Sequence, residues 1–280
     1  NIGAIIAPLS VPFVAAAYGW RMAFVATGSI GLIWLFFWYW LYDTPHRQKR
    51  LGSVEFDHIH SDADEVQPSG DTPAVKAPWS IILSFRPTWA YAIGKFLTDG
   101  IWWFYLFWLP DFLKEEYNLT KTDLALPVAL VYVLATVGSV FGGWLPMYFI
   151  SKGWPVFRAR KTSMLIYAFC VLPVLFSQIA GSYNMWFAIL IIGFAAAAHQ
   201  AWSANLYTTV SDALPKNLVA SVIGFGGMIG SLGGVLVAKV AGWLFDYYKG
   251  LGHIETGYYI MFIISGLAYL TAWLAMHILV

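Results

Sequence analysis

One apolar stretch of the sequence holds a cation, a carboxylate and an indole at helical spacing. Lys95 and Asp99 are four residues apart, and Trp102 follows three residues later. On a helix these positions share one face, so the two charges lie close enough to pair. A charge inside a membrane costs about 3 kcal/mol and must face protein or water. Two interpretations stay open: Lys95 attracts the carboxylate of a hydroxylated anion, or a self-neutralised pair locks this helix against a neighbour.

A second apolar stretch carries many hydrogen-bonding groups. It reads His199-Gln200-Ala201-Trp202-Ser203-Ala204-Asn205-Leu206-Tyr207. Helical spacing places His199, Trp202 and Ser203 on one stripe, and Gln200, Ser203 and Tyr207 on an adjoining one. These groups could bind sugar hydroxyls while an indole packs against the ring, and His199 could relay protons. The alternative is that they form hydrogen bonds between helices.

The composition indicates where such groups must lie. Of the 280 residues, 59% are hydrophobic and 11% are charged, against about a quarter charged in soluble domains. This excludes a soluble globular domain and predicts an all-α polytopic membrane protein. A net charge of +1 does not indicate nucleic-acid binding. Cys170 is the only cysteine, and hydrolase, nucleotide-binding and zinc-peptidase motifs are absent, so we expect no enzyme activity, cofactor or metal.

Eight stretches are long and apolar enough to cross about 30 Å of hydrocarbon. They lie near residues 2–17, 22–42, 88–112, 124–150, 162–181, 184–210, 217–245 and 257–279. If each crosses once, ten basic residues fall on one side and four on the other, while Lys95 and Lys239 fall within spans. The positive-inside rule then places the ten in the cytoplasm, together with the C-terminus.

A long polar segment separates the second span from the third. Residues 43–80 are rich in charge and proline, which predicts a flexible cytoplasmic linker. We therefore expect residues 1–42 to be the last two helices of an N-terminal six-helix bundle, and residues 81–280 to be a C-terminal six-helix bundle. The apolar start at Asn1 predicts a chain truncated at its N-terminus.

Three further patterns have simple interpretations. The Gly-x-x-x-Gly spacings at Gly138 and Gly142, and at Gly226 and Gly230, predict close helix packing. A basic loop over residues 142–161 is explained as a topological anchor. The linker also contains a weak metal-binding pattern, for which solvated disorder is the favoured interpretation: His58, His60, Asp62 and Asp64.

Particular strings in the sequence resemble bacterial hexuronate transporters, which are anion:cation symporters of the major facilitator superfamily. They are Gly94-Lys95-Phe96-Leu97-Thr98-Asp99, Trp102-Trp103-Phe104 and Ala198-His199-Gln200-Ala201-Trp202-Ser203-Ala204-Asn205. The resemblance implies that the eight spans are helices 5–12 of twelve, with substrate between two six-helix halves. It implies proton-coupled uptake of galacturonate or glucuronate by a monomer in the bacterial inner membrane, with the principal coupling carboxylates on helices outside this chain.

The substrate site predicted from both clusters and this resemblance contains nine residues: Lys95, Asp99, Trp102, Trp103, His199, Gln200, Trp202, Ser203 and Asn205. Two alternatives for the function stay open. One is a symporter of another organic anion, such as an aldarate, an aldonate or an aromatic acid. The other is a membrane sensor that binds its ligand without transporting it. The same resemblance assigns a gating role to the 142–161 loop, but that loop lacks the acidic residue of the family pattern.

Overall fold

The computed structural model describes residues 2–59, 61, 78–120 and 122–280 of the chain. Every regular secondary-structure element in these residues is a helix, which confirms the predicted all-α class. The chain divides into two units, Phe13–Lys76 and the combination of Asn1–Pro12 with Ala77–Val280. The assignment of residues 1–42 and 81–280 to two six-helix bundles stays a prediction.

The N-terminal helices follow the first two predicted spans closely. Helix α1 covers Ile2–Tyr18 and α2 covers Trp20–Leu41. Gly19 separates them with a φ of 83°, which a residue without a Cβ adopts at little cost. The segment predicted to be a flexible linker contains a short helix, α3, over Ser53–Ile59.

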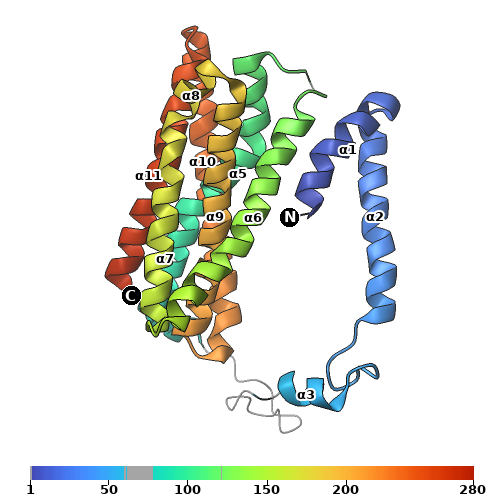
Figure 1. The fold of residues 1–280 in the computed structure, drawn as a ribbon, viewed down its shortest axis with the longest axis vertical. Coiled ribbons are helices and arrows are strands. Elements are labelled where there is room, and N and C mark those ends of the chain that lie inside the picture. Colours follow the sequence, from blue (N-terminus) through green and yellow to red (C-terminus); the bar gives the residue numbers. More distant parts are fainter. Residues whose placement is uncertain (1, 60, 62–77, 121) are drawn as a thin grey trace. The chain divides into compact units, whose positions relative to one another are not determined.

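The C-terminal helices run side by side as a bundle (Figure 1). They are α4 (Trp79–Ser84), α5 (Arg86–Tyr117), α6 (Ala125–Ser151), α7 (Val156–Val171), the 3-10 helix η1 (Leu172–Phe176), α8 (Ser177–Tyr183), α9 (Met185–Ala213), α10 (Lys216–Gly250) and α11 (Ile254–Leu279). Helix α5 packs against α9, α10 and α11, and α6 packs against α9 and α7. The two predicted clusters therefore lie on neighbouring helices, α5 and α9.

Local sequence signals set the ends of these helices. Pro155 and Pro215 immediately precede α7 and α10, where a missing backbone N–H costs no helical hydrogen bond. The side chain of Asn184 caps α9 by accepting a hydrogen bond from the backbone N–H of Trp186 at 2.9 Å. Asn118 ends α5 in the left-handed conformation with a φ of 53°.

Six helical segments in the described residues are long and apolar enough to span a membrane: Trp20–Leu41, Ala125–Ser151, Val156–Tyr183, Met185–Ala213, Lys216–Gly250 and Ile254–Leu279. The other two predicted spans are also helical. Helix α1 has only 17 residues. Helix α5 has 32 residues, but it carries Lys95 and Asp99 near its middle. All eight predicted spans are therefore helices, although six meet the requirements of length and apolarity.

Two predicted segments differ from the structure. The fifth span begins six residues earlier than expected, at Val156, and changes to a 3-10 helix at Leu172, next to Pro173. The expected loop over residues 142–161 is mostly helix, because α6 continues to Ser151 and α7 starts at Val156. A loop prediction there was wrong because Pro146 lies inside α6 without ending it. Only residues 152–155 lie between the two helices.

The predicted close packing at the glycines is confirmed. A Cβ on Gly138 would lie 2.1 Å from the carbonyl oxygen of Ala197, and one on Gly142 would lie 2.5 Å from the Cα of Ala201. These glycines bring α6 into backbone contact with α9. On α10, a Cβ on Gly233 would lie 2.1 Å from the carbonyl oxygen of Phe96, so α5 and α10 are equally close.

Candidate functional site

Lys95 and Asp99 form the ion pair that their spacing predicts. Lys95 Nζ lies 2.7 Å from Asp99 Oδ2, and the Lys95 side chain is only 6% exposed. Nζ also donates a hydrogen bond to Tyr207 Oη at 3.0 Å and lies 4.7 Å from the centre of the Tyr207 ring. The cation thus has a carboxylate on its own helix and a phenol from α9. This provides the pairing that a charge within a membrane requires.

Glycines on α10 make room for this ion pair. A Cβ on Gly230 would lie 2.5 Å from Asp99 Oδ2 and 3.3 Å from Lys95 Cβ. One turn earlier, a Cβ on Gly226 would lie 2.2 Å from the ring of Tyr91. Larger residues at these positions would displace the side chains of α5 that carry charge and hydroxyl groups.

Tyr91 completes what we call the Lys95 cluster: Tyr91, Lys95, Asp99 and Tyr207. Its ring centre lies 5.9 Å from that of Tyr207. The hydroxyl of Tyr91 is buried and has no hydrogen-bond partner in the described part of the chain. A buried hydroxyl without a partner costs free energy unless another group supplies the bond. The cluster therefore combines one cation, one carboxylate and two phenols, of which one has unused hydrogen-bonding capacity.

The second cluster is aromatic and is built around His199. The His199 ring stacks on Trp102 with centroids 5.0 Å apart and planes 8° from parallel. His199 Nδ1 is hydrogen-bonded to Tyr269 Oη at 2.6 Å, and Trp202 contacts the same Tyr269 ring edge to face at 5.7 Å. Trp102 also meets Tyr132 edge to face at 6.0 Å. The predicted residues Trp102, His199 and Trp202 are thus brought together.

Five of the nine predicted residues, all but Lys95, Asp99, Trp102 and His199, differ from one another in burial and contacts. Trp202 is fully buried, so its indole has no free face for a sugar ring. Asn205 is also buried, and its Nδ2 donates to the carbonyl oxygens of Gly142 at 2.6 Å and Ala201 at 2.9 Å. Trp103 is 41% exposed and lies beside Gly234 and Phe107. These positions favour packing roles for Trp202 and Asn205, while Gln200 and Ser203 are half-buried on α9.

Four tyrosines of the two clusters were missed by the sequence prediction: Tyr91, Tyr132, Tyr207 and Tyr269. Tyr91 precedes Lys95 by four residues, so the stripe of Lys95, Asp99 and Trp102 could have been extended backwards to include it. Tyr207 was placed on a stripe with Gln200 but was not assigned to the site. Tyr269 gave no local signal, because it meets His199 across 70 positions of the sequence.

Only one of the four residues of the predicted metal-binding pattern in the linker is among the described residues. His60, Asp62 and Asp64 lie outside the described residues, while His58 lies in the last turn of α3. Among the residues that the structure describes, His, Cys, Asp and Glu side chains do not gather in groups of three or more that could hold a metal ion.

Exchanging Asn205 for Ala tests whether this residue is structural. The change removes a hydrogen bond between α9 and α6, which in membranes contributes about 0.6 kcal/mol. We expect a small fall in the thermal midpoint of the full-length gene product in detergent, with unchanged affinity for galacturonate, a substrate that the resemblance implies. Gln200→Ala is the matched variant on the same helix, and we expect weaker binding with an unchanged midpoint. A loss of affinity in Asn205→Ala without a loss of stability would contradict this assignment.

The comparison with known families decides the class of this protein. The family model described as the Major Facilitator Superfamily matches residues 1–238. The chain belongs to the major facilitator superfamily. This confirms the predicted fold family, and it agrees with the expectation that the chain is not an enzyme, since the family and its relatives are named as transporters.

Several curated transporters are similar to this chain in sequence. The hexuronate transporter of Escherichia coli (strain K12) is 32% identical over 246 residues, which are 88% of this chain and 56% of that protein. The D-galactonate transporter of Escherichia coli O6:H1 is 25% identical, over 88% of this chain and 57% of that protein. The galacturonate transporter of Dickeya chrysanthemi is 30% identical over 53% of this chain and 43% of that protein. The chain thus spans about half the length of the first of these relatives.

Proposed function

We propose that this chain is part of a secondary transporter that carries hexuronates, such as galacturonate or glucuronate, across the bacterial inner membrane with a proton. The observation that carries the proposal is the position of Lys95, which is buried on α5. It is paired with Asp99 of the same helix and with Tyr207 of α9. Membrane-buried cations are costly, and they commonly mark the pathway of a substrate or ion. The similarity to the hexuronate and galacturonate transporters supports a sugar acid as the substrate.

Lys95 is the group that would bind the substrate carboxylate. In the empty site Asp99 neutralises the cation, and the incoming carboxylate takes over this role. Tyr207 and Tyr91 present phenol groups next to the same cation, where they can donate hydrogen bonds to a carboxylate or to sugar hydroxyls. Trp102, three residues beyond Asp99, stacks on His199 with one face, so its other face would pack against the sugar ring.

Charge balance gives a physical reason for coupling to protons. Lys95 and Asp99 together are neutral, so a monoanionic substrate adds one uncompensated negative charge to the site. An uncompensated charge within the membrane costs about 3 kcal/mol on insertion scales. A proton that enters with the substrate removes this cost. Rocking of two six-helix halves would then expose the loaded site to either side.

The orientation in the membrane follows from the distribution of charge. Ten basic residues fall on the side of the 43–80 segment and four on the other. The positive-inside rule places that segment and the C-terminus in the cytoplasm.

An aldonate is the second candidate substrate. The D-galactonate transporter is similar over the same 88% of this chain as the hexuronate transporter, although at 25% rather than 32% identity. Hexuronates and aldonates both carry one carboxylate and several hydroxyls, so the Lys95 cluster could bind either.

Uptake by the full-length gene product in proteoliposomes tests this function. We expect labelled galacturonate to enter faster when the external solution is more acidic than the interior. Excess unlabelled glucuronate should block this uptake, and neutral galactose should not. Stronger inhibition by galactonate than by glucuronate would favour the aldonate. Inhibition by galactose would contradict recognition through the carboxylate.

A further inference from the structure

The start of α7 and the end of α11 meet away from the Lys95 cluster. Trp273 Nε1 on α11 donates a hydrogen bond to the backbone carbonyl oxygen of Lys161 on α7 at 2.9 Å. Because α7 begins at Val156 and α11 ends at Leu279, this contact joins two helix ends at the same surface of the bundle. In a membrane-spanning bundle, helix ends lie at the interface between lipid and water.

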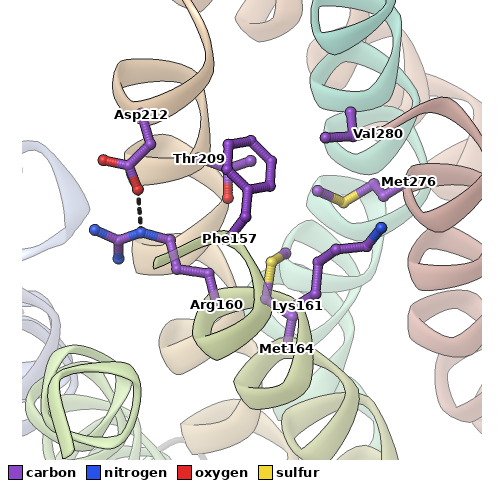
Figure 2. A pocket seen from close by; sticks show the side chains of 8 residues that line it. All are labelled: Phe157, Arg160, Lys161, Met164, Thr209, Asp212, Met276 and Val280. Atoms are coloured by element: carbon purple, nitrogen blue, oxygen red, sulfur yellow. Dashed lines mark hydrogen bonds and ion pairs between the residues drawn. The ribbon is translucent and has the colours of Figure 1, made fainter. Parts of the chain in front are cut away.

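Two adjoining hollows open at this place. The first, shown in Figure 2, lies between α7, α9 and α11. The second is an open groove of about 410 Å³ between α7 and α11, and its lining includes Arg158, Lys161, Leu165, Trp273 and His277. Lys161 lines both hollows. We call the second hollow the α7–α11 groove.

Two of the charged residues that line the first hollow, Arg160 and Asp212, are already paired with each other. Arg160 forms an ion pair with Asp212 of α9, and Figure 2 shows Lys161 pointing away from this pair toward Met276 and Val280. The Lys161 ammonium makes no ion pair or hydrogen bond with any residue that the structure describes. Asp212 is therefore not a counter-ion for Lys161.

The α7–α11 groove is cationic and has an aromatic wall. Arg158 lies 4.7 Å from the ring centre of Trp154, and His277 stacks on Trp273 at 4.8 Å. Among the residues that the structure describes, no Asp or Glu side chain lines this groove. Two fixed cations in one hollow repel each other, and they are stabilised by an anion that binds both.

We propose that the α7–α11 groove binds the phosphate headgroup of an anionic phospholipid. Arg158 and Lys161 would contact the phosphate, and Leu165 and Trp273 would contact the upper part of the acyl chains. Basic pockets between helix ends attract anionic headgroups, and tryptophan is enriched at this depth of the membrane. The apolar part of the lining distinguishes a lipid from free phosphate, which would gain nothing from Leu165 or Trp273.

Native mass spectrometry of the full-length gene product in neutral detergent tests this site. Phosphatidylglycerol and phosphatidylcholine would be titrated separately, and the lipid-bound fraction would be measured. We expect about 30-fold tighter binding of phosphatidylglycerol, because each of the two basic residues favours an anionic lipid at the membrane surface. Inorganic phosphate at millimolar concentration should not displace it, whereas displacement by inorganic phosphate would mean that the site recognises a free anion and would overturn the proposal.

The double variant Arg158→Gln and Lys161→Gln should lose the preference for phosphatidylglycerol. Lys152→Gln is the matched control, because Lys152 is exposed in the same connection between α6 and α7 but does not line the groove. We expect this control to keep the preference. An equal loss in both variants would show attraction to general surface charge and overturn the proposal, as would an unchanged preference in the double variant. Equal elution volumes in size-exclusion chromatography would establish that the variants are folded.

Discussion

Replacing Lys95 by Met in the full-length gene product is expected to weaken galacturonate binding by about 10- to 100-fold, because a hydrogen bond to a charged group contributes about 1.5–3 kcal/mol. Met keeps most of the length of the side chain and removes the cation. The substrate carboxylate would then meet Asp99 without a positive charge between them. Equilibrium binding of labelled galacturonate to the purified protein in detergent measures this change.

Two further variants separate a binding role from a structural one. Lys239→Met is the matched control, because Lys239 is the other lysine of a predicted span and is exposed on α10. We expect it to bind galacturonate normally. Lys95→Met leaves Asp99 buried without its cation, which destabilises the fold, and adding Asp99→Asn should restore stability without restoring binding. Restored binding in the double variant would show that the ion pair only locks α5 in place.

Replacing Gly138 by Ala is expected to lower the thermal midpoint of the protein strongly. The added Cβ would lie 2.1 Å from the carbonyl oxygen of Ala197, so α6 and α9 must move apart. Overpacking of this kind typically costs about 1–3 kcal/mol. Thermal unfolding in detergent, followed by circular dichroism, measures the effect.

Gly143→Ala is the control for this prediction. Gly143 lies on the same helix, and a Cβ there would have no atom within 4 Å. The same exchange of Gly for Ala is therefore made with no steric cost, and we expect an unchanged or slightly higher midpoint. Equal midpoints for the two variants would contradict the close approach of α6 and α9.

The parts of the fold that depend on local sequence could be predicted. Apolar stretches gave the eight spans, and the spacing of Lys95 and Asp99 gave their ion pair, because residues four apart on a helix are neighbours. The glycine spacing on α6 also predicted close packing correctly, although it did not identify the partner helix. The linker boundaries and the N-terminal truncation stay predictions.

Contacts between distant parts of the chain could not be predicted in the same way. Tyr207 meets Lys95 across 112 positions, and no periodicity within one helix reveals such a partner. The sequence prediction assigned residues from two adjoining stripes of α9 to one site, but these residues differ in burial. Trp202 and Asn205 are buried against neighbouring helices, whereas Gln200 and Ser203 are half-buried. Which helix covers which face is decided by tertiary packing.

Counterflow in proteoliposomes without a proton gradient tests the central claim most directly. Vesicles containing the full-length gene product would be loaded with unlabelled galacturonate and diluted into a trace of labelled galacturonate. We expect transient accumulation of label in these vesicles, and none in vesicles loaded with galactose or containing the Lys95→Met variant. Absence of accumulation in a folded preparation that still binds galacturonate would contradict transport and would indicate a sensor that binds without transporting.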